Sequence, residues 1–143
     1  MKIFVVNGPN LDMLGKREPT IYGADTLESI NAELAEFCNN LGIEVEFYQS
    51  NSEGALIDII HSAREKADGI VLNAGAYTHY SIAIRDAISA AEKPCVEVHL
   101  SNVHKREEFR HKSVISAVCE GVICGFGKDV YSLGITALYN KLK

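Results

Sequence analysis

Three polar stretches follow apolar, strand-like runs, and each carries side chains that can take part in chemistry. Asn7-Gly8-Pro9-Asn10 follows the first run, Asn73-Ala74-Gly75 follows the third, and residues 97–102 include His99. Amides bind hydroxyl and carbonyl oxygens, and an imidazole exchanges protons near neutral pH. Each stretch alone has the composition of an ordinary turn. Because all three are expected at one edge of a parallel sheet, together they favour a binding or catalytic site.

A long segment between the first strand-like run and the first helical run is a second candidate. Residues 11–25 contain Arg17 and Tyr22 and are punctuated by Gly15 and Gly23. A strand-to-helix connection usually needs about two to six residues, and extra length is often functional. The glycines therefore indicate a lid over the strand ends. A solvated loop with a tyrosine packed beneath it is the alternative.

Five apolar runs of strand length recur along the chain, mostly separated by segments with helical period. They cover residues 3–6, 43–48, 70–72, 95–100 and 122–126. This alternation predicts an α/β three-layer sandwich, a parallel sheet with helices on both faces. Only residues 43–47 alternate cleanly between apolar and polar side chains, which favours an edge position and the flavodoxin-like order 2-1-3-4-5. Ligands would then bind at the carboxyl ends of strands one, three and four.

The first helix has the clearest pattern, because apolar residues recur with helical period over residues 27–41. Asp25 and Glu28 are predicted to cap its start, and Gly42 to mark its end. Three further helices are expected, over residues 56–67, 81–91 and 131–142. Because no repeat, low-complexity tract or linker interrupts the pattern, residues 1–143 are expected to form a single catalytic domain.

The composition is that of an ordinary globular protein, with 47% hydrophobic and 23% charged residues. The 143 residues are enough for one compact core. A net charge of -5 provides no broad basic field, so neither nucleic acid nor an anionic membrane is expected as a partner. An anionic ligand would have to be captured by a few local positive groups.

Further features constrain the location and the cofactors. The apolar start is too short for a signal peptide, and no run approaches the ~20 apolar residues of a membrane span, so a cytoplasmic protein is expected. The four cysteines include no C-x-x-C pair and are interpreted as buried free thiols of a reducing compartment. The histidines outside the strand ends, His61, His104 and His111, have no convincing metal-ligand spacing. Neither a metal nor a cofactor is therefore expected.

Four segments resemble type II 3-dehydroquinate dehydratase in their residues, order and spacing. They are NGPNL at 7–11, REPTIYG at 17–23, NAGAYTH at 73–79 with Arg85 and Asp86, and EVHLSNVHKREEFR at 97–110. Together they run through almost the whole chain and are far more specific than a single short motif. The resemblance implies a hydro-lyase of the shikimate pathway, which leads to chorismate and aromatic amino acids. Its reaction would be anti elimination of water from 3-dehydroquinate, through an enolate, to give 3-dehydroshikimate.

The resemblance gives Tyr22 the role of the base that removes a proton from the carbon beside the ketone. An unperturbed tyrosine has a pKa near 10 and is only about 0.1% ionised at pH 7. A close cation can lower the pKa of an acid by about 1 to 3 pH units. Arg17 matches the family residue with this role, so closure of the lid would bring Arg17 to Tyr22 and assemble the base.

His99 matches the general acid that protonates the departing hydroxyl group. Glu97 lies two residues earlier, on the same side of an extended strand, where it can hold the imidazole or raise its basicity. Asn10 resembles the residue that positions a water molecule on the enolate oxygen. With Tyr22 and Arg17, these residues complete the catalytic set that the resemblance implies.

The resemblance also implies the contacts with substrate and with other subunits. The amides of Leu100 and Ser101, with the Ser101 hydroxyl, would bind the substrate carboxylate. The ring hydroxyls would be bound by Asn73, His79, Asp86 and Arg110. Arg106 is interpreted as part of the solvated face of a charged run, with a lid contact as the alternative. The family forms trimers grouped into a homododecamer, in which Asp86 is a candidate for a contact across a subunit boundary.

Two other functions fit parts of the pattern. The inferred topology alone permits a flavodoxin-like binding or signalling module. A phosphoacceptor receiver, however, would need acids where the chain has Asn7 and Asn73, and a flavin binder would need a Ser/Thr-rich loop after the first strand. The dehydroquinate dehydratase that works through a lysine Schiff base is a barrel of about 250 residues, for which this chain is too short.

Overall fold

A five-stranded parallel sheet forms the centre of the fold. The computed structural model describes residues 1–16, 18–22 and 24–143. The strands are β1 (Lys2–Asn7), β2 (Glu44–Gln49), β3 (Gly69–Asn73), β4 (Cys95–His99) and β5 (Gly121–Cys124). They pair in the order β2-β1-β3-β4-β5, which confirms the α/β, flavodoxin-like order 2-1-3-4-5 predicted from the sequence.

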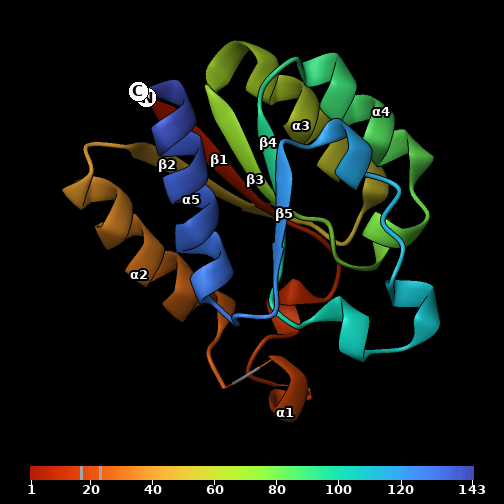
Figure 1. The fold of residues 1–143 in the computed structure, drawn as a ribbon. Coiled ribbons are helices and arrows are strands. Elements are labelled where there is room, and N and C mark those ends of the chain that lie inside the picture. Colours follow the sequence, from red (N-terminus) through yellow and green to blue (C-terminus); the bar gives the residue numbers. More distant parts are fainter. Residues whose placement is uncertain (17, 23) are drawn as a thin grey trace.

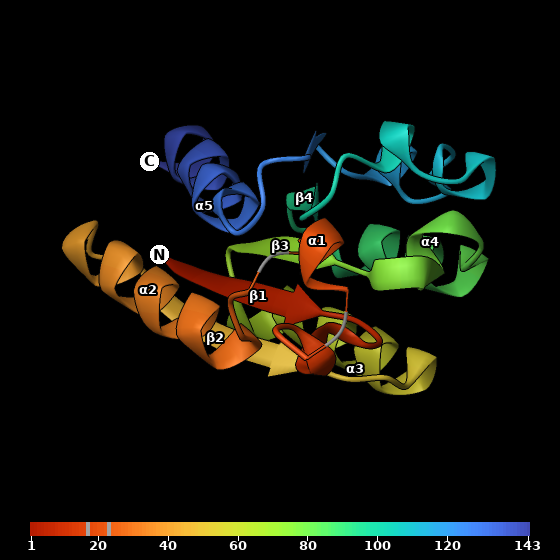
Figure 2. The same ribbon diagram turned by 90° about the horizontal axis from the view of Figure 1, so that it is seen from below.

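Helices cover both faces of the sheet and complete the three layers (Figure 1, Figure 2). The long ones are α2 (Leu27–Asn40), α3 (Glu53–Lys66), α4 (Ile82–Ala91) and α5 (Asp129–Leu142). α2 and α5 pack on one face of the sheet, whereas α3 and α4 pack on the other. Within the part of the chain that the structure describes, no helix combines the length and the apolar character that crossing a membrane requires.

Strand β1 shows how the alternation of side chains builds the core. Ile3 and Val5 belong to the cluster beneath α2 and α5, Phe4 and Val6 belong to the cluster beneath α3 and α4, and all four are fully buried. β3 and β4 are also buried along their whole length, because they lie inside the sheet with helices on both faces. β2 and β5 are the edge strands and contain exposed and half-buried residues, as predicted for the second strand.

The start of α2 differs from the sequence prediction. The Thr26 hydroxyl accepts a hydrogen bond from the Ser29 amide, and the Ser29 hydroxyl accepts one from the Thr26 amide, both at 3.1 Å. The predicted cap by Asp25 and Glu28 is therefore wrong by one position, because two short hydroxyl side chains close the capping box instead. At the other end, Gly42 has a φ of 73°, as its role as a stop signal requires.

The cysteines are free thiols, as predicted, although their burial varies. Cys38 and Cys95 are buried, whereas Cys119 and Cys124 are half-buried. Burial raises the pKa of the Cys38 thiol to about 11, so this side chain stays protonated at neutral pH and packs as a small apolar group.

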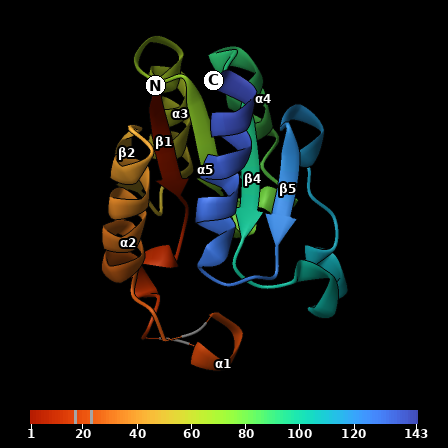
Figure 3. The same ribbon diagram turned by 60° about the vertical axis from the view of Figure 1, so that its left-hand side comes forward.

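The carboxyl ends of the strands lie at the edge of the sheet that carries most of the irregular segments (Figure 3). The long connection after β1 contains a 3-10 turn at Leu11–Met13 and the single turn of α1 (Pro19–Tyr22). The charged first part of the connection after β4, residues 102–113, contains two more such turns, Val103–Lys105 and Glu108–Arg110. Both chain termini lie at the opposite edge. The stretches in which the sequence predicted chemistry therefore gather at one end of the molecule.

Gly8 allows the segments after β1 and β3 to approach each other closely. Its amide donates to the Asn73 carbonyl oxygen at 2.7 Å. A β-carbon added at residue 8 would lie 2.6 Å from the carbonyl oxygen of Ala74. Because this neighbour is backbone rather than a flexible side chain, it cannot rotate away.

The substitution Gly8→Ala is expected to lower the free energy of unfolding by about 1–3 kcal/mol, because the two strand ends must move apart. Denaturation in urea measures this loss. Gly121→Ala is the matched control, since its added β-carbon meets none of the described atoms within 4 Å. The control should change stability by less than about 0.5 kcal/mol, and equal losses in both variants would contradict the explanation.

Candidate active site

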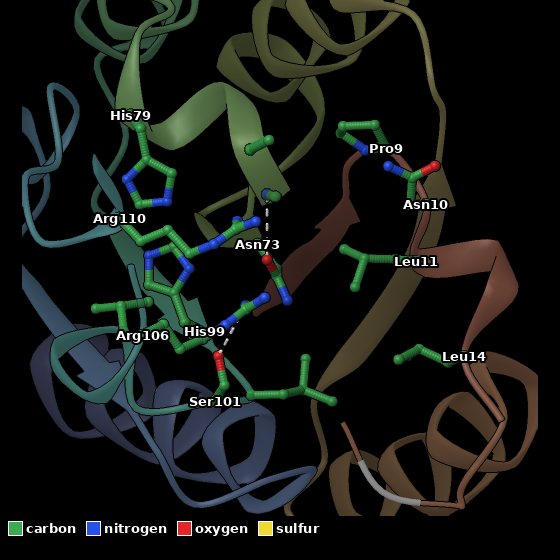
Figure 4. A pocket seen from close by; sticks show the side chains of 14 residues that line it. Pro9, Asn10, Leu11, Leu14, Asn73, His79, His99, Ser101, Arg106 and Arg110 are labelled. Atoms are coloured by element: carbon green, nitrogen blue, oxygen red, sulfur yellow. Dashed lines mark hydrogen bonds between the residues drawn. The ribbon is translucent and has the colours of Figure 1, made fainter. Parts of the chain in front are cut away.

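A cavity of about 140 Å³ opens at the carboxyl edge of the sheet, between the connections that follow β1, β3 and β4. Its described lining residues are Pro9, Asn10, Leu11, Leu14, Asn73, Gly75, Ala76, His79, His99, Leu100, Ser101, Val103, Arg106 and Arg110. Figure 4 shows a largely apolar wall from the connection after β1, facing polar and basic side chains from the other two connections. The cavity therefore lies at the three strand ends where the sequence predicted ligand binding.

His99 and Glu97 form a hydrogen-bonded pair at the end of β4. Because side chains alternate along a strand, the two lie on the same face, and His99 Nε2 is 2.6 Å from Glu97 Oε2. Both are nearly enclosed, with 7% and 1% of their surface exposed. His99 is part of the cavity wall, and Glu97 lies behind it. With Nε2–H donated to Glu97, Nδ1 is the ring nitrogen that can exchange a proton with a ligand.

The surroundings of Glu97 favour its charged form. Burial raises the pKa of the Glu97 carboxyl group, but hydrogen bonds from His99, Ser116 and Ser113 lower it by more, so the net pKa is below its ordinary value. The ionised carboxylate accepts His99 Nε2–H and holds the ring in one orientation, which leaves Nδ1 for a ligand.

His79 faces His99 from the 3-10 turn that follows β3. The two ring centroids are 6.2 Å apart and the rings are inclined by 19°. His79 Nδ1 lies 2.8 Å from the Lys112 carbonyl oxygen, so Nδ1–H donates to it and Nε2 is the acceptor of the neutral ring. Burial lowers the pKa of His79 and outweighs the opposing effect of the Lys112 carbonyl. A neutral His79 can accept a hydrogen bond from a ligand hydroxyl group.

Two arginines give the cavity its positive charge. Arg106 Nη1 lies 3.4 Å from Ser101 Oγ (Figure 4), and only 14% of the Arg106 side chain is exposed. The interpretation of Arg106 as a solvated side chain is therefore wrong, because the turns of this connection fold it back over the end of β4. Arg110 Nε lies 3.1 Å from Glu107 Oε1. Since none of the described lining residues is acidic, the cavity favours an anionic ligand.

Asn10 and Asn73 bring amide groups to the cavity from different strand ends. Asn10 has a left-handed backbone with a φ of 69°, and its backbone N–H donates to Asn51 Oδ1 at 3.0 Å. Asn73 Nδ2 donates to the Tyr131 hydroxyl at 3.2 Å, and Asn73 Oδ1 accepts from the Gly75 amide at 3.2 Å. These bonds fix the orientation of the Asn73 amide.

Tyr131 links Asn73 to Asn7 through a buried chain of neutral groups. Its hydroxyl donates to Asn7 Oδ1 at 2.5 Å while it accepts from Asn73. Burial raises the pKa of Tyr131 far above its ordinary value, so the hydroxyl remains a neutral donor. A phosphoacceptor site needs acids at these strand ends, where the structure has an asparagine-tyrosine-asparagine chain. The signalling alternative therefore lacks its central residues.

Most residues assigned to the site by the sequence resemblance line this one cavity. They are Asn10, Asn73, His79, His99, Leu100, Ser101 and Arg110. Asp86 is exposed on α4 and is not among the described lining residues. Arg17 and the side chain of Tyr22 lie outside the described residues, so the predicted contact between them stays a prediction.

The sequence did not point to the apolar wall of the cavity. Leu11, Leu14 and Val103 are buried and line it, yet their residue types are those of any core position. Arg106 was detectable in principle, because it belongs to the connection that leaves the carboxyl end of the fourth strand. That position is a stronger indicator of function than the mixed charges of its neighbours.

Comparison with known proteins agrees with this geometry. The family model for dehydroquinase class II matches residues 1–139. The 3-dehydroquinate dehydratases of Jannaschia sp. and Carboxydothermus hydrogenoformans are both 59% identical over 143 residues, covering 100% of this chain and 97% and 93% of theirs. The crystal structure of type II dehydroquinase from Butyrivibrio crossotus is 53% identical, covers 97% of each chain and superimposes with a TM-score of 0.95. The chain described here belongs to the class II dehydroquinase family.

Proposed function

We propose that this chain removes water from 3-dehydroquinate by anti elimination through an enolate, with Tyr22 as the base and His99 as the acid. As a type II 3-dehydroquinate dehydratase, it is a hydro-lyase of the shikimate pathway. The observation that carries the mechanism is the buried pair of His99 and Glu97 at a cavity lined by two arginines. The reaction takes a proton from a carbon beside a ketone and a hydroxyl from the next carbon. It therefore needs a base, an oxyanion stabiliser and an acid.

His99 supplies the acid. Its Nε2–H is committed to Glu97, so the protonated Nδ1 donates to the departing hydroxyl group, which leaves as water. The ionised Glu97 stabilises the imidazolium before transfer and keeps the ring oriented. After transfer, the neutral imidazole regains a proton and the Tyr22 phenol loses one to solvent, which restores both groups for the next turnover.

Tyr22, as a phenolate, takes the proton from the carbon beside the ketone, and Arg17 lowers the pKa of the phenol. The backbone of α1, which carries Tyr22, lies beyond the carboxyl ends of the strands (Figure 3), and the cavity opens at this same edge of the sheet. The connection after β1 would act as the lid, so its closure would exclude water and deliver the base.

The remaining polar groups bind the substrate and its enolate. Asn10 holds a water molecule on the enolate oxygen, and the amides of Leu100 and Ser101 with the Ser101 hydroxyl bind the carboxylate. Arg106, which already contacts Ser101, adds positive charge beside that carboxylate. The ring hydroxyls are bound by Asn73, His79 and Arg110, which line the same cavity.

The assembly is proposed to be a homododecamer built from trimers, within which Asp86 contacts substrate across a subunit boundary. Asp86 is exposed on α4, and the apolar side chains of Tyr80 and Ile82 nearby in the chain are 62% and 57% exposed. Exposed apolar side chains of this size favour a protein contact. Residues 1–143 would act as one catalytic domain in each subunit, and a cytoplasmic location stays a prediction.

The direct test is to add 3-dehydroquinate to the full-length protein and follow the ultraviolet absorbance of the conjugated enone product. Substrate deuterated on one face of the carbon beside the ketone gives the stereochemistry. Anti elimination expels the hydrogen on the face opposite the departing hydroxyl group, so deuterium placed there should be lost. Borohydride added with substrate should leave the activity intact. Absence of the enone, or inactivation by borohydride, would overturn the proposal.

A further inference from the structure

The carboxylate behind His99 is held by two serines that lie far from it in the sequence. Ser116 Oγ donates to Glu97 Oε1 at 2.5 Å, and Ser113 Oγ donates to the same oxygen at 3.1 Å. The other oxygen, Glu97 Oε2, receives His99 Nε2–H at 2.6 Å. The two oxygens of the carboxylate thus have different donors: the serines donate to Oε1, and the imidazole donates to Oε2.

The direction of the hydrogen bond from Ser113 follows from its other contacts. Ser113 Oγ accepts from the amide of Ile115 at 3.2 Å and from the amide of Ser116 at 3.1 Å. With both lone pairs of the hydroxyl engaged, its proton is left for Glu97. The acceptor is therefore the carboxylate, which is the form of Glu97 that such donors stabilise.

The segment that carries the two serines is fixed to the core of the protein. Ile115, between them, is fully buried among the side chains beneath α3 and α4. The Val114 amide donates to the Thr78 carbonyl oxygen at 2.9 Å, which joins this segment to the turn that bears His79. The hydroxyl groups are therefore held at a defined distance from β4 rather than on a free loop.

We propose that Ser116 and Ser113 are positioning residues for catalysis, which hold Glu97 ionised and aligned so that His99 can act as the acid. The proposal rests on the acid role of His99 given above. Neither serine is among the described lining residues of the cavity, so we infer that both act through Glu97. Without their donated hydrogen bonds, the enclosed carboxylate would take up a proton more readily and would support the imidazolium less.

Other ionisable groups lie near Glu97 and His99, and the effect of Ser116 on Glu97 has to be distinguished from theirs. His79 faces His99 from the turn after β3, and Arg110 and Arg106 line the cavity from the connection after β4. Cys95 begins the strand that carries Glu97 and is buried. None of these groups contacts the serine hydroxyls through a described hydrogen bond, so a change at Ser116 reaches the pair through Glu97.

The test uses the full-length enzyme with 3-dehydroquinate over a range of pH. Ser116→Ala is expected to lower kcat about tenfold at neutral pH while KM stays within about twofold. The ratio of its kcat to that of the unmodified enzyme should fall further as the pH decreases, because protonation of Glu97 becomes easier. Ser116→Thr keeps a hydroxyl and should restore most of the rate. Ser62→Ala, which removes a hydroxyl bonded only to the Ile59 carbonyl among the described contacts, is the control and should match the unmodified enzyme.

A double-mutant comparison separates this inference from the acid assignment. If Ser116 acts through Glu97, adding Ser116→Ala to Glu97→Gln should cause almost no further loss of kcat. A full additional tenfold loss, or an unchanged pH profile in the single variant, would overturn the positioning role. If instead Glu97→Gln left kcat unchanged, the proposed role of Glu97 in supporting the acid His99 would be wrong.

Discussion

Replacing Tyr22 with phenylalanine is expected to lower kcat by about a hundredfold to ten-thousandfold, with little change in KM. Phenylalanine keeps the ring but cannot accept the proton that leaves the carbon beside the ketone. Steady-state measurement of enone formation gives both constants. Retention of more than about half of the rate would rule out Tyr22 as the base.

The proposed contribution of Arg17 to this base should be visible in the pH dependence of kcat. Without the cation of Arg17, the pKa of Tyr22 would rise towards its ordinary value near 10, so less phenolate would be present at neutral pH. Arg17→Ala should therefore lower kcat near pH 7 and recover part of it as the pH increases. Arg17→Lys preserves the positive charge, so its kcat near pH 7 should lie between that of the unmodified enzyme and that of Arg17→Ala. A loss that is equal at every pH would show that Arg17 does not act on the ionisation of Tyr22.

Replacing His99 with asparagine is expected to stop dehydration without stopping proton removal. Loss of the acid should lower kcat by about a hundredfold to ten-thousandfold, because the hydroxyl group must then leave without a proton. Tyr22 is still present in this variant, so enolate formation should continue. In deuterium oxide, His99→Asn should exchange the hydrogen beside the ketone of 3-dehydroquinate while producing almost no enone, whereas Tyr22→Phe should do neither.

The exchange experiment assigns the two roles independently of overall rate. His61→Asn is the matched control, since His61 is exposed on α3 and lies apart from the described cavity lining. It should retain full dehydration. If His99→Asn abolished both exchange and dehydration while the protein remained folded, His99 would be needed for proton removal and the division of roles would be wrong.

The elements of the fold were predictable because their signals are local. The runs that became β1 and β3 are apolar over residues 3–6 and 70–72, and the run that became β4 is apolar except for Glu97 and His99. A strand covered on both faces needs such a mainly apolar pattern. The alternating run that became β2 indicated an edge strand for the same reason. The errors were also local: β5 ends at Cys124 rather than at residue 126, because Gly125 turns the chain with a φ of 96°.

Seven of the residues that line the cavity were named from the family motifs, but their arrangement could not be predicted. Arg106 illustrates the difference, because its place in a run of mixed charges is typical of a solvent-exposed segment. Only the folding of that connection over the strand end brings its guanidinium to Ser101. The path of an irregular connection depends on packing, which has no periodic signature in the sequence.

By itself, the sequence determined which elements form, their order in the sheet and the edge at which chemistry gathers, because burial on one or both faces leaves a repeating pattern. Only the tertiary structure decided which distant side chains support that chemistry. Ser113 and Ser116 reach Glu97 across separations of 16 and 19 residues, and Tyr131 reaches Asn7 across 124. Such contacts form only when distant segments pack together. The sequence around a serine or a tyrosine contains no pattern that identifies its distant hydrogen-bond partner.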